Sequence, residues 1–223
     1  AGSSNAFAAA LLVGVLLPCL VLPLRAGSVR HWASSLGLYA GAVAPVGLVL
    51  ILRASPFMTD LVLDALAWGG AALACGAAVQ MGRQSRIDRA LTWGYVSQLG
   101  GLLIAVALGS VHVVAALVAV HAAALVGVVI AVDGVREAAV TWELRDLGVL
   151  RSRRALGAGL MLCALGLGGL PPLGGYYAMR EGFALAHLAA SSWAVVPAWW
   201  IAQLLVTCCV FRIVFFAWRG RGR

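Results

Sequence analysis

Long apolar runs separated by short arginine-bearing stretches make up almost the whole of this 223-residue sequence. Hydrophobic residues account for 63% of the chain and charged residues for only 11%, a balance found in polytopic helical membrane proteins rather than in soluble domains. We therefore predict an all-α polytopic membrane protein that forms a single membrane domain over residues 1–223.

The apolar runs predict seven or eight transmembrane helices. The seventh run has only about 15 residues, fewer than the roughly 20 that a full crossing takes. Either this segment does not fully cross, or the seventh and eighth runs count as two spans. The approximate ranges are 7–24, 34–52, 58–81, 90–109, 111–132, 155–170, 176–190 and 193–218.

The basic residues are all arginine, and they indicate the topology. The loops after the first, third and fifth runs carry two, three and five arginines, which places them on the cytoplasm-like side. The arginine-rich C-terminus lies on that side only if the seventh run does not cross. The last of these loops, residues 133–154, has apolar positions near helical spacing, so we expect it to lie along the membrane interface.

Proline and glycine interrupt the helical pattern at two places. Pro45 lies inside the second run, where it removes a helix hydrogen bond and is expected to kink the span near mid-depth. Pro171 and Pro172 end the sixth run, and Gly174 and Gly175 precede the seventh. Broken helices inside a bilayer survive only where protein or water covers the backbone, and in transporters they often mark ion paths. A short loop between two spans explains the second break equally well.

Three segments carry motifs in a fixed order. The first reads IDRALTWGYVSQLGG, residues 87–101. The second joins ELRDLGVL, residues 143–150, to GLPPLGGYY, residues 169–177. The third reads TCCVFRIVFFAW, residues 207–218.

Taken together, these segments resemble the proton-pumping antiporter-like subunits of respiratory complex I, a family shared with cation/proton antiporter complexes and membrane-bound hydrogenases. The corresponding family motifs are D-x-K-R-x-L-A-Y-S-S-I-S-H-L-G, then D-L-R-G-L followed by A-G-L-P-P-L-A-G-F-F, then Y-Y-Y-L-R. Residues 121–130, HAAALVGVVI, are most similar to the subunit 2 (N-type) member. The resemblance covers the second half of a full member, which has about fourteen spans with inverted repeats. The chain is then either the C-terminal part of a split protein or a shortened homologue.

The resemblance implies lysines on the broken helices, because a buried lysine can exchange a proton near neutral pH whereas arginine stays protonated. By alignment the three family lysines fall on Pro45, on Leu125, and on Met179 or its neighbour Arg180. None of these positions is lysine. We therefore expect the channel of this chain to be degenerate, or else rebuilt from other groups.

Four other residues are candidates for such a rebuilt proton path: Asp64, His121, Glu181 and Arg212. Asp64 lies one turn inside the third run, and His121 lies near the middle of the fifth, where a packing role is the simpler interpretation. Arg212 lies deep in the last run and is expected either to pair with Glu181 or to extend to the interface.

By resemblance, the chain is expected to be a membrane-arm subunit of a complex I-type NADH:quinone oxidoreductase, in the bacterial plasma membrane or the mitochondrial inner membrane. We expect it to have no active site, metal or cofactor of its own, with NADH, flavin, iron–sulfur clusters and quinone bound by partner subunits. The expected partners are other membrane-arm subunits, a separate chain that supplies the missing half, and lipids, but no nucleic acid. A subunit of a cation/proton antiporter or hydrogenase complex and a purely structural assembly subunit are the alternatives.

Overall fold

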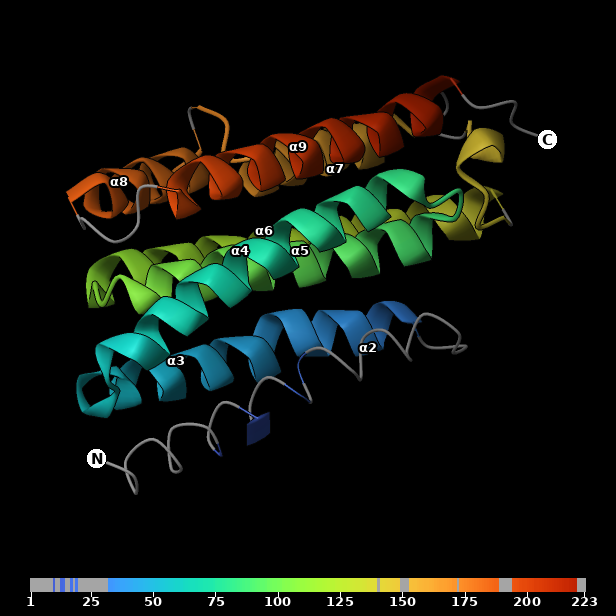
Figure 1. Cartoon of the computed structure of the whole chain (residues 1–223). Coiled ribbons are helices and arrows are strands. Elements are labelled where there is room, and N and C mark those ends of the chain that lie inside the picture. The colour runs from blue at the N-terminus through green and yellow to red at the C-terminus, as the bar shows by residue number, and fades with distance from the viewer. Residues whose placement is uncertain are drawn as a thin grey trace.

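The computed structural model describes residues 10, 13, 14, 17, 19, 32–139, 141–148, 153–171, 173–188 and 194–219. In these residues it is a bundle of helices that lie roughly side by side (Figure 1). The elements are α2 (Trp32–Leu38), the π-turn η1 (Tyr39–Val43), α3 (Ala44–Ala54), the 3₁₀ turn η2 (Ser55–Phe57), α4 (Asp60–Arg83), α5 (Ile87–Ala107), α6 (Val111–Ala139), the 3₁₀ turn η3 (Leu144–Asp146), α7 (Arg154–Leu167), α8 (Gly174–Leu188) and α9 (Val195–Arg219). The all-α prediction is confirmed.

Five stretches of the described chain are long and apolar enough to cross a membrane: Ala33–Phe57, α4, α5, α6 and α9. The shortest, α5, has 21 residues and so rises about 32 Å, close to the thickness of the hydrocarbon core. The prediction of a polytopic membrane protein is confirmed. The first predicted span, residues 7–24, lies almost wholly outside the described residues.

The predicted sixth and seventh spans correspond to α7 and α8, which have 14 and 15 residues. At 1.5 Å per residue each helix is only about 21–23 Å long, which is too short to cross the hydrocarbon core. Figure 1 shows that α7 and α8 follow one another along the bundle beside α9, so the two halves together make one crossing. The end of α9 then lies at the same end of the bundle as the α4–α5 connection and residues 141–148.

Helix α5 lies at the centre of the bundle. Eighty-nine per cent of its most apolar window is buried, against 39–50% for the other four long stretches. Small residues allow α4 to approach it closely, because a Cβ added at Gly100 would lie 2.5 Å from the Ala74 nitrogen. The Ser97 hydroxyl donates a hydrogen bond to the Ala74 carbonyl at 2.8 Å.

The segment expected to lie along the membrane interface, residues 133–154, contributes to two parts of the fold. Its first seven residues continue α6 to Ala139. Residues 141–148 then pass between neighbouring helices and form backbone hydrogen bonds with them: Ile87 donates to Trp142, and Gly148 donates to Phe216. Leu144 and Leu147 are almost fully buried there. Within residues 141–148 these two leucines therefore pack inside the end of the bundle, whereas residues 140 and 149–152 of the segment lie outside the described residues.

Candidate functional site

The first helix break lies between α2 and α3. The five residues Tyr39–Val43 form a π-turn that is followed by Ala44 and Pro45, and the Ala44 N–H donates to the Tyr39 carbonyl, five residues back. A π-turn accommodates a proline because the longer hydrogen-bond register leaves room for a residue without an N–H. The interruption predicted at Pro45 is therefore present as a local change of helix type.

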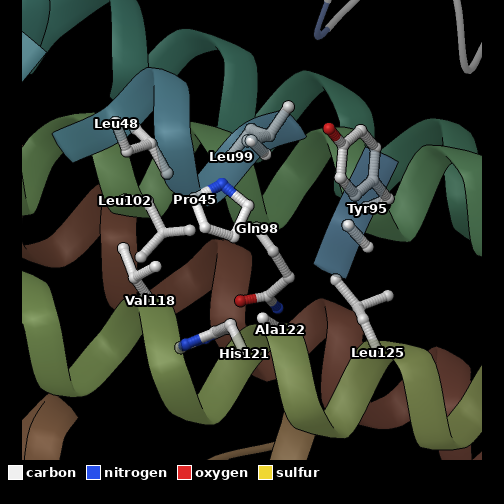
Figure 2. A pocket seen from close by; sticks show the side chains of 12 residues that line it. Pro45, Leu48, Tyr95, Gln98, Leu99, Leu102, Val118, His121, Ala122 and Leu125 are labelled. Atoms are coloured by element: carbon white, nitrogen blue, oxygen red, sulfur yellow. The ribbon is translucent and has the colours of Figure 1, made fainter. Parts of the chain in front are cut away.

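A small cavity lies beside this break, between α3, α5 and α6 (Figure 2). Its volume is about 10 Å³, room for about one water molecule. Pro45 and Leu125 both line it, so the fold brings together two of the three positions at which the resemblance implies lysine. Among the described residues, its other lining side chains are apolar except for Tyr95, Gln98 and His121.

His121 is 3% exposed, and its Nδ1 lies 2.7 Å from the carbonyl oxygen of Leu117 on the preceding turn. Since a carbonyl oxygen only accepts, Nδ1 carries the hydrogen in this bond and Nε2 is the nitrogen left for other partners. Figure 2 shows the Gln98 side chain extending from α5 toward the turn of α6 that carries His121. His121 is therefore a buried imidazole with one fixed nitrogen at the edge of the cavity.

A chain of buried amides connects this cavity with the second helix break. The Gln98 Nε2 donates to the Gln203 Oε1 at 3.2 Å, and the Gln203 Nε2 donates to the Leu167 carbonyl, in the last turn of α7, at 2.8 Å. The Thr207 hydroxyl lies 3.2 Å from the Gly168 carbonyl. Neither glutamine was among the predicted candidates. Two features of the sequence could have indicated them. Both are amide side chains inside apolar runs, and Gln98 occupies the position of the histidine in the first family motif.

The second break separates α7 from α8. Gly169 has a positive φ of 64°, and Pro171 lies in the connection, whereas Pro172 lies outside the described residues. Gly174 and Gly175 open α8, and a Cβ at Gly175 would lie 2.5 Å from the Gly166 carbonyl. Glycine thus lets the start of α8 pack directly on the end of α7, as the predicted break requires.

The third lysine position falls on Met179 or Arg180. Met179 is 4% exposed, and both residues line a groove beside this break, where Arg180 is exposed. The groove is open on its outer side and has a volume of about 310 Å³. No lysine therefore stands at either break, and among the described residues that line this groove only Arg180 is charged.

The predicted charged candidates do not gather at these breaks. Asp64 and Glu181 are exposed. Arg212 does not pair with Glu181. Its guanidinium donates instead to the last carbonyls of α4, at 2.6 Å from Gly82 and 2.8 Å from Gln84, with Met81 at 3.4 Å. Arg212 is thus a cap on a helix C-terminus, which is electrostatically favoured for a cation.

The cysteines of the described residues are all unpaired. Within those residues no three His, Cys, Asp or Glu side chains are placed to hold a metal ion. The arrangement of two interrupted helices whose breaks are linked through the middle of a membrane bundle defines a class: polytopic proteins built on the broken-helix plan of secondary transporters.

The comparison with known families identifies the chain within this class. Residues 5–206 match the family described as NADH:quinone oxidoreductase/Mrp antiporter, transmembrane, and the chain belongs to this family. It is an integral membrane protein of this family.

Three relatives illustrate the similarity. NADH-quinone oxidoreductase subunit N 2 of Roseiflexus castenholzii is 39% identical over 71 residues, which are 31% of this chain and 14% of that protein. The chloroplastic NAD(P)H-quinone oxidoreductase subunit 5 of Anthoceros angustus is 26% identical over 202 residues, 83% of this chain and 27% of that protein. NADH-ubiquinone oxidoreductase chain 2 of Hyaloraphidium curvatum is 29% identical over 129 residues, 58% of this chain and 28% of that protein. The chain spans 14–28% of the length of these relatives.

Proposed function

We propose that this chain is a membrane-arm subunit of a complex I-type NADH:quinone oxidoreductase, in which it supports the proton-translocating module while its own channel is degenerate. It has no active site of its own in this proposal. NADH, flavin, iron–sulfur clusters and quinone belong to partner subunits.

The observation that carries the proposal is the chemistry of the cavity beside Pro45. A proton relay through hydrocarbon needs titratable groups linked by water. Pro45 and Leu125 replace two such groups with apolar side chains, and the cavity has room for about one water molecule. The connection onward to the second break runs through Gln98 and Gln203, whose amides neither bind nor release protons near neutral pH.

His121 is the group through which a rebuilt path would have to run, so it provides the test. We expect His121→Phe and Asp64→Asn, introduced into the intact complex, to leave both NADH:quinone turnover and the number of protons pumped per electron unchanged. The measurement is quinone reduction together with proton uptake in closed vesicles. Loss of pumping by His121→Phe while quinone reduction continues would show that the path is active and would refute a degenerate channel.

The family also includes subunits of cation/proton antiporters, and this is the second candidate function. Isolation of the assembly from membranes through a tag on this chain distinguishes the two. Copurification of flavin and iron–sulfur subunits supports the complex I assignment. Copurification of antiporter-like chains without any redox subunit supports the antiporter assignment.

A further inference from the structure

The groove beside the second helix break faces outward from the bundle. Its two long walls are the facing sides of α8, with Tyr176, Arg180 and Phe183, and of α9, with Trp200 and Leu204. Trp200 is 55% exposed and Leu204 is 65% exposed, so the rim is accessible from the surroundings of the bundle. A volume of about 310 Å³ is at the lower end of the range of small-molecule sites.

Contacts with α6 show how deep the groove lies. Gly174, at the start of α8, packs against Val120, and Gly182 packs against Val113, near the start of α6. At 1.5 Å per residue these levels are about 14 Å and 3 Å from the first residue of α6. Arg180 therefore lies about 6 Å inside this end of the apolar bundle, within reach of the headgroup region for a long side chain. The groove extends from mid-depth to that level.

Arg180 is exposed at the shallow end of the groove. The ion pairs of the described residues are formed by Arg86 and Arg136, and none involves Arg180. A cation at the mouth of an apolar groove near the membrane surface is complementary to a ligand with an anionic head and an apolar tail.

We propose that this groove binds one acyl chain of an anionic phospholipid from the surrounding bilayer, with the headgroup phosphate against Arg180. The wall on α9 runs from Trp200 to Thr207, about 10 Å along the bilayer normal, which matches the direction of an acyl chain. The chain fills the apolar walls, and the phosphate neutralises the arginine.

The test uses the intact assembly in nanodiscs that contain phosphatidylglycerol with a photoreactive acyl chain, with mass spectrometry of the cross-linked α8 and α9 peptides. We expect Arg180→Gln to lower cross-linking about fivefold and Arg180→Lys to retain most of it, the size expected for one basic residue at a lipid headgroup. Leu204→Trp should abolish cross-linking because it fills the groove. A probe based on phosphatidylcholine should label these peptides about as weakly as phosphatidylglycerol labels Arg180→Gln.

Two control variants match these changes. Ile201→Trp adds the same bulk at a position of α9 that is 55% exposed and does not line the groove. Arg53→Gln removes an exposed arginine at the end of α3, at the same end of the bundle. Both should label like the unmodified protein. Equal labelling of Arg180→Gln and Arg53→Gln, or of Leu204→Trp and Ile201→Trp, would overturn the proposal. So would capture of a neighbouring subunit by a photoreactive residue at position 204.

Discussion

Arg212 shows how one residue can hold a charge inside an apolar helix without an acidic partner. Three carbonyl groups at the end of α4 accept hydrogen bonds from its guanidinium, which also ties α4 to α9. The two glutamines are paired in a similar way, but with neutral groups. The Gln98 amide nitrogen donates to the side-chain oxygen of Gln203, and the Gln203 amide nitrogen donates to the Leu167 carbonyl. Buried polar atoms are costly unless they are paired, so both arrangements should contribute to stability.

Replacement of Arg212 by methionine should lower the free energy of unfolding by about 2–3 kcal/mol, because charge-assisted hydrogen bonds to the carbonyls at the end of α4 are lost. The measurement is the unfolding midpoint of the protein in lipid-containing micelles. Arg53→Met, an exposed arginine at the end of α3, is the control and should change the midpoint little. Equal midpoints for the two variants would contradict the capping role.

The two glutamines should behave as a coupled pair. Gln203→Leu leaves the Gln98 amide and the Leu167 carbonyl unpaired and should cost about 1–3 kcal/mol. Adding Gln98→Leu removes one of these unpaired groups, so the double variant should be destabilised by less than the sum of the single changes. A double-mutant cycle of unfolding free energies measures this coupling, and strict additivity would show that the hydrogen bond contributes nothing.

At the scale of elements, α7 and α8 form one crossing only because the chain can turn tightly between them. The close approach of Gly175 to the Gly166 carbonyl sets the packing of the start of α8 on the end of α7. Gly174, the neighbouring residue, faces the Val120 side chain instead, with 3.3 Å available to a Cβ. A side chain can adjust to an added methyl group more easily than a backbone carbonyl can.

These two glycines give a matched test of the break. Gly175→Ala should destabilise the protein by about 1–3 kcal/mol, because overpacking against backbone forces the two helices apart. Gly174→Ala should cost clearly less, since Val120 can shift. Thermal unfolding of both variants, compared with the unmodified protein, is the measurement. Greater destabilisation by Gly174→Ala than by Gly175→Ala would contradict this packing.

At the scale of the whole molecule, the pairing of α7 with α8 decides the topology. With one crossing for the two halves, the end of α9 lies with the α4–α5 connection and with residues 141–148, to which Phe216 is hydrogen-bonded. The arginines of that end then all lie on one side of the membrane, as the positive-inside rule requires.

Reporter fusions test this arrangement in cells. A reporter that is active only in the cytoplasm should be active when fused after Arg219 or inserted between α4 and α5, and inactive when inserted at Thr59, between α3 and α4. Opposite results for the first two positions would mean that α8 crosses the membrane by itself.

Much of this architecture could be predicted from the sequence, because long apolar runs and prolines allow few backbone conformations inside a bilayer. Runs of about 20 apolar residues must be helical there, and Pro45 and Pro171 must interrupt them. The partner of Arg212 could not be predicted in the same way. Its side chain contacts carbonyls about 130 residues earlier in the chain, and every backbone carbonyl looks alike in a sequence.

The sequence by itself determined the class of protein, the positions of the helix breaks and the absence of lysine, because these depend on composition and on local chemistry. Only the tertiary structure decided that α7 and α8 share one crossing, and that Pro45 and Leu125 face the same cavity. It also decided that Gln98 and Gln203 connect that cavity to the second break. These features depend on which helix faces lie against each other, and side-chain packing between segments far apart in the chain determines that.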